Sequence, residues 1–242
     1  MSKDYDAFKD IFLSLKKLFS RLFGYVRTGT DRLKTVGSKL RYRSSLYYRA
    51  TARPYELLVR SKGAYGEYLL YDRLRRVKGR WLFNVYLPKK EETTEIDALL
   101  ICKRGIFVFE SKNFAGRIYG RADAKEWYQT VMTGKGIAKQ RFFNPIMQNG
   151  AHKRALDMLI GEDCPVYPVV VFGRGCRLMI PPEEYDPNVM TTLDRLPSFL
   201  KKFRGGLSDG QIDGLYSRLL PYTQVSDGEK KKHIAYAKER YR

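Results

Sequence analysis

Two carboxylates and a lysine interrupt a segment that is otherwise typical of two apolar strands. Asp97 lies in the run TEIDALLICK, and Glu110 and Lys112 lie in the run GIFVFESK that follows. Carboxylates placed close together repel each other unless a cation lies between them, and Mg²⁺ prefers such oxygen ligands. A bound metal polarises a phosphodiester and activates water, while an ammonium offsets developing negative charge. The pattern is compatible with metal-dependent phosphodiester hydrolysis, with the Ser111 carbonyl as an extra ligand.

The turn between the two runs decides whether these side chains meet. Glycine tolerates the positive φ of tight hairpin turns, which favours a two-residue loop here. A loop at 104–105 would place Asp97 opposite Lys112, and a loop at 103–104 would place it opposite Glu110. In both registers the three side chains share one face, because side chains alternate along a strand. A three-residue loop would separate them unless a bulge restored the register.

A purely structural role is the alternative for this group of charges. Lys112 would then neutralise two carboxylates at a sheet edge and take part in no chemistry. Buried ion pairs add little net stability, which makes them poor choices for maintaining a fold alone. The spacing by itself leaves both interpretations open, and the prediction of a site depends on the two strands being adjacent.

The elements around this group predict an α/β core with a mixed β-sheet flanked by helices. GAYGEYLLYDRLRRV has the pattern of a helix, RWLFNVYLP that of a strand, and a short GRIYG strand follows the two charged runs. A loop containing Trp127 comes next. Asn144 and Pro145 then suit the start of a helix that Gly161 ends, and CPVYPVVVFG is expected to be a further buried strand. The order of helix, three strands, helix and strand is that of an α/β fold.

Several of these segments together resemble the nuclease-related domain (NERD) family of the PD-(D/E)xK nuclease superfamily. The matching pieces are Gly66-Glu67, TEIDALLI, GIFVFESKNFAGRIYG, Trp127 and NPIMQN, and they cover about residues 60–175. The family pattern usually has a proline before the aspartate, where this chain has Ile96. No zinc-finger or helicase module is recognisable, so the DNA context stays open.

The resemblance implies a restriction-endonuclease-like core and hydrolysis of DNA that depends on Mg²⁺ (or Mn²⁺) and leaves a 5′-phosphate. It assigns Glu67, Asp97 and Glu110 to the metal, and Lys112 to catalysis. Gln148 would match a glutamine that the second helix presents toward substrate or water. Taken alone, Glu67 is more often a surface charge. His152 lies four residues after Gln148 on the same helix face and is expected to be a packing residue.

The charge of the chain predicts a polyanionic partner. Its 242 residues carry a formal net charge of +20, with 46 Lys and Arg against 26 Asp and Glu. Such a charge exceeds what solubility requires and points to nucleic acid or an anionic membrane surface. Tyrosines at 42, 47 and 48 are interleaved with basic residues and suit phosphate contact plus stacking, although a solvated linker with helical character fits residues 27–53 equally well. We expect DNA contacts at Arg41, Arg43, Lys103, Arg104 and Trp127, although Trp127 suits a core or lid role equally well.

The N-terminal segment leaves three interpretations open. Residues 8–26 alternate apolar and basic positions with helical spacing, and they are too often charged to span a bilayer. Such a helix binds an anionic membrane surface, binds a partner, or packs on its own domain. Three cysteines without CxxC pairing predict a cytoplasmic location, with a membrane-peripheral one as the alternative.

We therefore expect three regions. Residues 1–54 form a basic amphipathic helical extension, 55–180 the nuclease core, and 181–242 a helical C-terminal region whose basic tail begins at the capping pair Ser226 and Glu229. The predicted activity is metal-dependent hydrolysis of DNA. The alternative is a catalytically inactive nucleic-acid-binding or membrane-peripheral protein that retains the nuclease-like fold. The sequence does not indicate whether the substrate is single-stranded, double-stranded or RNA. It also does not indicate whether cutting is endonucleolytic or exonucleolytic, or which oligomeric state the protein has.

Overall fold

The computed structural model describes residues 36–89, 92–186, 188–226, 228–230, 232 and 235. The segment 8–26, for which a membrane-binding helix is one interpretation, lies outside the described residues. The chain divides into two compact units, Met1–Tyr55 and Glu56–Arg242, which are described separately. In the part of the chain that is described, no helix is both long and apolar enough to cross a bilayer.

The first unit is organised around tyrosines. Residues 36–43 are helical, and α2 (Leu46–Thr51) begins at Ser45, whose side chain accepts from the Tyr48 N–H. Tyr42 and Tyr47 are fully buried, and the Tyr42 hydroxyl donates to the Arg53 carbonyl at 2.7 Å. The expectation that these two tyrosines stack on nucleic acid is therefore wrong, because their rings form a local core. Arg41 and Arg43 are exposed, as contact with a polyanion would require.

The second unit is built on a five-stranded mixed sheet in the order β1-β2-β3-β7-β9. Its first three strands, β1 (Arg80–Lys89), β2 (Glu92–Cys102) and β3 (Gly105–Lys112), are antiparallel. β7 (Val166–Phe172) runs parallel to β3, and β9 (Met190–Thr192) runs parallel to β7. The predicted mixed α/β core is confirmed. The strand β9 was not anticipated, since helices and turns were expected after residue 181.

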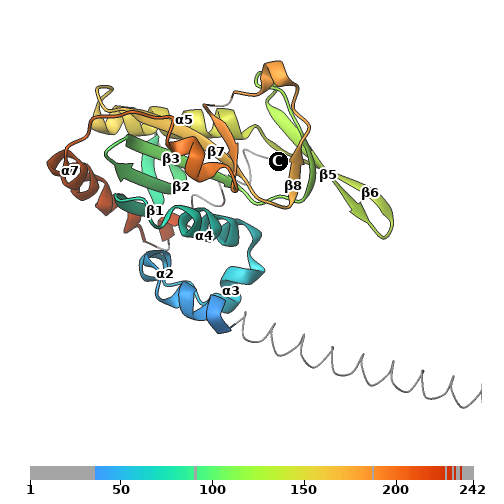
Figure 1. Ribbon diagram of the computed structural model, residues 1–242, viewed down its shortest axis with the longest axis horizontal. Helices are drawn as coiled ribbons and strands as arrows, with labels where there is room; N and C mark the ends of the chain where they lie inside the picture. The colour runs from blue at the N-terminus through green and yellow to red at the C-terminus, as the bar shows by residue number, and fades with distance from the viewer. Residues whose placement is uncertain are drawn as a thin grey trace, which may run out of the picture. The chain divides into compact units, whose positions relative to one another are not determined.

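Helices cover both faces of this sheet (Figure 1). On one face α5 (Pro145–Ile160) and α7 (Asp209–Leu219) pack on aliphatic residues of β1, β2 and β3. On the other face α4 (Lys62–Leu74) packs through Tyr71 against the rings of Trp81 and Phe83. The expected ends of α5 are confirmed: the Asn144 side chain accepts from Ile146 N–H at 2.9 Å, and Gly161 is the C-cap.

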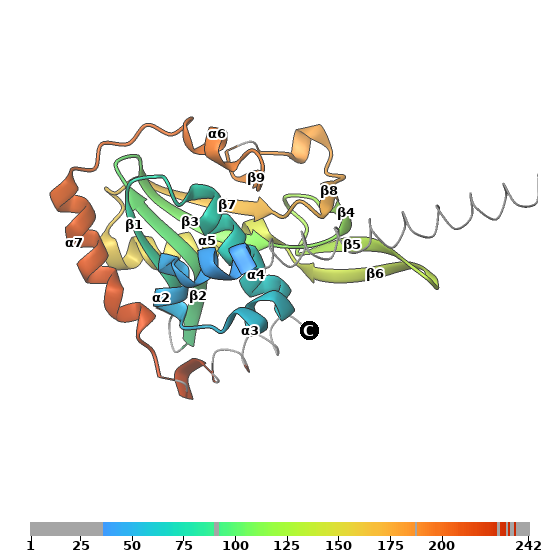
Figure 2. The same ribbon diagram turned by 60° about the horizontal axis from the view of Figure 1, so that its bottom comes forward.

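A second sheet in the order β6-β5-β4-β8 follows β3. It contains β4 (Gly116–Tyr119), β5 (Glu126–Thr133), β6 (Gly136–Phe143) and β8 (Cys176–Leu178). The segment around Trp127, expected to be a loop, is therefore a hairpin strand. Figures 1 and 2 show the tip of the β5–β6 ribbon extending beyond the rest of the second sheet.

The C-terminal region completes the second unit. α6 (Leu196–Leu200) buries Leu196 and Phe199, and α7 contributes Ile212 and Leu219 to the core under α5. α7 begins with a capping box formed by Ser208 and Gln211. η1 (Pro182–Glu184) and η2 (Leu220–Thr223) are short 3₁₀ helices, and α3 (Tyr55–Arg60) crosses the boundary between the units.

The capping pair expected near the C-terminus is confirmed. The Ser226 N–H donates to the Glu229 carboxylate at 2.8 Å, and the Glu229 N–H donates to the Ser226 hydroxyl at 3.2 Å. These two bonds satisfy main-chain donors that the first helical turn cannot pair. The described residues beyond it, 228–230, 232 and 235, are helical.

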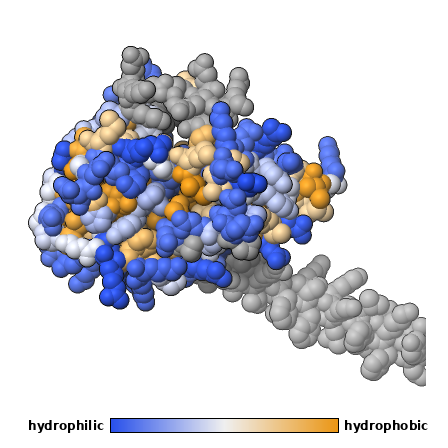
Figure 3. All heavy atoms as spheres, turned by 90° about the horizontal axis from the view of Figure 1, so that it is seen from above, coloured by the Kyte–Doolittle hydropathy of each residue, from blue (hydrophilic) through white to orange (hydrophobic). Residues whose placement is uncertain are grey.

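The surface seen from above the α5 side is mainly hydrophilic, with scattered apolar residues (Figure 3). Exposed large apolar side chains include Met158 on α5, and Met132 and Ile137 on the β5–β6 ribbon. Single exposed apolar residues of this kind are normal on a folded protein. The distribution of charge therefore carries more information about partners than hydropathy does.

Candidate active site

The β2–β3 hairpin turns at Lys103 and Arg104. Cys102 pairs with Gly105, and the ladder ends where Ala98 pairs with Phe109. This is the register that places Asp97 opposite Glu110, one position beyond the last pair. There the Asp97 Oδ2 accepts from the main-chain N–H of Ser111 at 2.8 Å, so a side chain replaces main-chain pairing.

The ladder between β1 and β2 is also irregular at Asp97. Phe83 pairs with Ala98 and Val85 with Ile96, which leaves Asn84 and Asp97 between two regular pairs. Asn84 has a φ of 51°, in the left-handed region that non-glycine residues seldom occupy within a strand. The side chains of Ile96 and Leu99 lie in the same core cluster although they are three residues apart. Asp97 therefore does not follow the strict alternation that the sequence argument assumed.

Glu110 is the centre of a buried polar network. It is 2% exposed, and its Oε1 lies 2.6 Å from the Lys112 ammonium. Its Oε2 lies 3.2 Å from His152 Nε2. Burial raises the pKa of Glu110, but Lys112 and His152 outweigh burial and lower it to about 2. Glu110 is therefore ionised at neutral pH, and His152 Nε2 is the donor in their contact because a carboxylate can only accept.

Asp97 is shifted in the opposite direction. Burial raises its pKa well above the usual 3.8, and the negative charges of Glu110 and Glu67 raise it further. The Ser111 N–H and the Lys112 ammonium lower it only in part. Asp97, Glu110 and Glu67 are thus close enough to repel one another. The protonation of Asp97 or a bound cation would relieve this repulsion.

Helix α5 supplies the polar groups on one side of the network. Lys112 Nζ donates to Gln148 Oε1 at 3.1 Å, and His152 lies one helical turn later on the same face. His152 Nδ1 lies 2.7 Å from the Thr94 hydroxyl, which ties the ring to β2. The amide of Asn149 donates to the Val108 carbonyl at 2.9 Å and holds the helix against β3.

Helix α4 places Glu67 on the other side through the glycine that precedes it. A Cβ on Gly66 would lie 2.6 Å from the Asn113 Cβ and 3.0 Å from the Ser111 hydroxyl. Only glycine allows this separation between the helix and the end of β3. Asn113 also donates to the Lys62 carbonyl at 3.0 Å, which fixes the first turn of α4.

The predicted contact residues of the second unit are Trp127, Lys103 and Arg104, and their surroundings differ from those of the carboxylate site. Trp127 is fully buried, its ring stacks on Phe172, and its N–H donates to the Arg121 carbonyl at 2.8 Å. It cannot stack on a base, so that prediction is wrong and the core role holds. Lys103 and Arg104 lie six or more residues from Asp97 along the hairpin, roughly 20 Å at the rise of an extended strand. They belong to the opposite end of the sheet.

Carboxylate oxygens dominate the group, which fits a hard divalent cation. Asp97 and Glu110 present carboxylates from adjacent strands, and Glu67 on α4 is near enough for its charge to act on Asp97. Within the described residues no three His, Cys, Asp or Glu side chains are arranged to hold a metal ion between them. The mutual repulsion that raises the pKa of Asp97 is nevertheless the property that a cation would neutralise.

Two features of the site were not predicted from the sequence. His152 was expected only to pack, yet it contacts Glu110 directly and links it to Thr94. Its spacing of four residues from Gln148 was the available signal, because both side chains then face the same strands. Asn84, opposite Asp97, has a left-handed backbone conformation. This conformation could not be predicted, because the sequence around Asn84 has the alternation of an ordinary strand.

Comparison with known proteins shows a similarity between part of this core and one family. Residues 62–173 match the nuclease-related domain, NERD. An uncharacterized protein of Bacillus anthracis is 27% identical over 151 residues, which cover 62% of this chain and 69% of that protein. No solved structure matches the chain. The matched segment contains Glu67, Asp97, Glu110, Lys112 and Gln148. Over residues 62–173, a little under half of its length, this chain is therefore similar to the nuclease-related domain.

Proposed function

We propose that this chain is a Mg²⁺- or Mn²⁺-dependent nuclease that hydrolyses phosphodiester bonds of DNA. A nuclease-related function is what the similarity of residues 62–173 to the nuclease-related domain suggests. The proposal of metal and DNA rests chiefly on one observation. Two carboxylates whose pKa values are shifted in opposite directions lie beside a lysine that is held by Glu110 and Gln148. Such divergent shifts in neighbouring groups are typical of catalytic sites.

The carboxylates of Asp97, Glu110 and Glu67 would hold the metal. When bound, Mg²⁺ or Mn²⁺ would polarise the scissile phosphate and lower the pKa of a coordinated water. Glu110 is already ionised because Lys112 and His152 stabilise its charge. Asp97 carries the less stable charge, so it is the ligand whose ionisation gains most from a cation.

Lys112 and Gln148 would act on the substrate side. The Lys112 ammonium is fixed by the Glu110 carboxylate at 2.6 Å and by Gln148 Oε1 at 3.1 Å. A positive charge held in this way stabilises negative charge that develops on a phosphate oxygen. Because Gln148 accepts from Lys112 through Oε1, its amide N–H groups are oriented away from Lys112 and suit a water or phosphate oxygen.

The charge of the chain supports DNA as the substrate. A net charge of +20 attracts a polyanion and favours contacts with its phosphates that do not depend on sequence. Arg41 and Arg43 in the first unit are exposed cations that would add such contacts. RNA carries the same phosphates, so the cleavage test includes both nucleic acids.

The test is cleavage of supercoiled plasmid, linear duplex and single-stranded DNA and RNA by the purified chain with Mg²⁺ or Mn²⁺. We expect DNA cutting that EDTA stops and that Asp97→Asn and Lys112→Ala each reduce to a small fraction of the wild-type rate. Arg154→Gln, on the exposed face of α5, is the matched control and should cut like the wild type. DNA binding without cutting under either metal would contradict the proposal and indicate a binding protein.

A further inference from the structure

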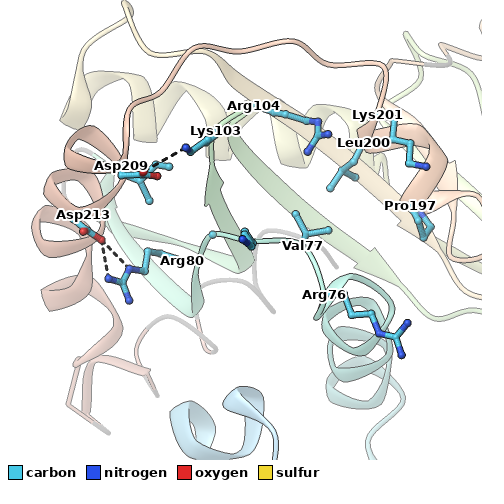
Figure 4. Close-up of a pocket in the computed structure, with 13 residues that line it drawn as sticks. Arg76, Val77, Arg80, Lys103, Arg104, Pro197, Leu200, Lys201, Asp209 and Asp213 are labelled. Atoms are coloured by element: carbon cyan, nitrogen blue, oxygen red, sulfur yellow. Dashed lines mark hydrogen bonds and ion pairs between the residues drawn. The ribbon is translucent and has the colours of Figure 1, made fainter.

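A second polar region lies at the other end of the β2–β3 hairpin. There a pocket of about 810 Å³ opens between the turn, the end of α4, the start of β1, and helices α6 and α7 (Figure 4). Its polar side chains are mostly basic, and none of its residues belongs to the carboxylate site. The basic residues are Arg76, Lys78, Arg80, Lys103, Arg104 and Lys201.

Two acidic residues neutralise only part of this charge. Asp213 accepts from Arg80, with the closest atoms 2.8 Å apart, and Asp209 lies 3.3 Å from the Lys103 ammonium. Figure 4 shows both pairs on the same side of the pocket. Over the described ranges, the other four cations have no ion-pair partner; they are Arg76, Lys78, Arg104 and Lys201.

The unpaired cations come from three segments, namely the connection between α4 and β1, the hairpin turn, and the end of α6. Arg76 follows α4, Lys78 precedes β1, Arg104 is in the hairpin turn, and Lys201 follows α6. Like charges that the fold gathers in one place repel one another and raise the local potential, which attracts anions. Nothing in the packing of the second unit requires these side chains to be basic, because all four are exposed.

The pocket also has an apolar part. Leu200 and Ile212 are buried beneath it, and Val77 and Pro197 add partly buried surface. Figure 4 shows Arg104 and Lys201 on either side of Leu200. A phosphate with the face of a base beside it matches such a lining, since nucleotides combine an anionic group with a flat, weakly polar ring.

We propose that this pocket binds nucleic-acid phosphates as a second contact, separate from the carboxylate site. The proposal deepens the proposed function and rests on it for the identity of the ligand. Lys103 and Asp97 lie roughly 20 Å apart along the hairpin, by the rise of an extended strand. A nucleic acid that reaches both places therefore spans about six nucleotides at about 3.4 Å per step.

Binding by the full chain to a fluorescein-labelled 20-base-pair DNA duplex, followed by anisotropy in EDTA, tests the proposal. The variant is Arg104→Gln with Lys201→Gln, which removes two exposed, unpaired cations and no ion pair. The matched control is Lys202→Gln with Arg154→Gln, which removes the same charge outside the pocket. We expect the first variant to bind about tenfold more weakly than wild type and the control to bind within about twofold of it.

Salt dependence sharpens the result. The slope of log Kd against log salt should fall by about 1.8 in the first variant, at about 0.9 for each phosphate that the variant no longer neutralises. Equal affinity and slope in the wild type and the first variant would overturn the proposal. Deoxyadenosine 5′-monophosphate binding that the variant loses, with duplex binding unchanged, would also overturn it, since the pocket would then serve free nucleotides. Because EDTA prevents metal-dependent cleavage, a chain that binds in this way but never cuts refutes only the proposed function.

Discussion

The two ends of the β2–β3 hairpin differ in how their charged residues are held. At the open end, Glu110 Oε1 lies 2.6 Å from the Lys112 ammonium. Helix α5 contributes His152 and Gln148 to the same network. At the turn, Lys103 and Arg104 are exposed, and Lys103 has a surface ion pair at 3.3 Å. One rigid pair of strands thus presents a buried acidic group at one end and an exposed basic group at the other.

This difference predicts how each end responds to substitution. A buried, coupled group transmits each change to its neighbours, because a charge that loses its partner cannot be solvated by water. Exposed cations act almost independently and are screened by salt. Substitutions at the open end should therefore change chemistry and stability together, whereas those at the turn should change affinity for polyanions.

The largest contrast is expected between the lysines at the two ends. Lys112→Ala should lower the rate of DNA cleavage by roughly 10³-fold, because on the proposed function it removes the fixed charge that would stabilise the transition state. Lys103→Ala should lower cleavage by at most about tenfold, through weaker DNA binding. Single-turnover rates at saturating metal measure both variants. Equal reductions in the cleavage rate would contradict the proposed difference between the two ends of the hairpin.

Glu110→Gln should be the most destabilising single change at the site. It leaves the largely buried Lys112 without its anionic partner and should lower the free energy of unfolding by about 3 kcal/mol at pH 7. The pKa of Glu110 is lowered to about 2 in the fold, so its stabilisation is present above its usual 4.5 and is lost as pH falls toward 2. Urea unfolding at pH 7 and pH 3.5 should show the gap between variant and wild type narrow at the lower pH. A constant gap would contradict the ionised state of Glu110.

Gly66→Ala should displace α4 from the end of β3. The new Cβ would overlap Asn113 and crowd Ser111, at a cost of about 1–3 kcal/mol of unfolding free energy. Because Glu67 is the next residue, cleavage should fall as well. Gly63→Ala on the same helix is the matched control, since its Cβ would meet nothing within 4 Å, and it should be neutral or stabilising. Equal effects of the two substitutions would show that helix propensity, and not contact with β3, decides the outcome.

Asp97→Asn should give the smallest change in stability, with the opposite sign. The amide keeps an acceptor for the Ser111 N–H and removes the repulsion from Glu110 and Glu67. We expect a gain of about 1 kcal/mol at neutral pH without metal, or about 2–4 °C in Tm. A carboxyl with a raised pKa favours the fold when protonated, so the advantage of the variant should vanish as pH falls below the usual 3.8. A loss of stability at pH 7 would show that Asp97 is a structural residue.

Much of the fold was predictable because its signals are local. The cap at Asn144, the stop at Gly161 and the apolar strands on either side of the charged residues all follow from short-range chemistry. The adjacency of Asp97 and Glu110 depended on a two-residue turn, which the structure has at Lys103 and Arg104. The choice between the two possible registers could not be made from the sequence.

The features that were missed depend on contacts distant in sequence. The sequence left a stacking role and a core role equally open for Trp127, and the choice depends on its contact with Phe172 of β7. The basic context of Tyr42 suggested a binding surface, whereas its hydroxyl and ring are held within the first unit. The strand β9 has three residues, too few to show a period. The role of His152 required knowing that α5 crosses the end of β3.

Thermal unfolding with and without Mn²⁺ tests the central claim most directly, since it reports on the carboxylate site without any substrate. In wild type, Mn²⁺ at about 100 times its Kd should stabilise the fold by about 2.7 kcal/mol, or roughly 5–10 °C in Tm. Asp97→Asn should start from a higher Tm and show almost no shift. No shift in wild type, or an equal shift in both proteins, would contradict the assignment of Asp97, Glu110 and Glu67 to a metal site.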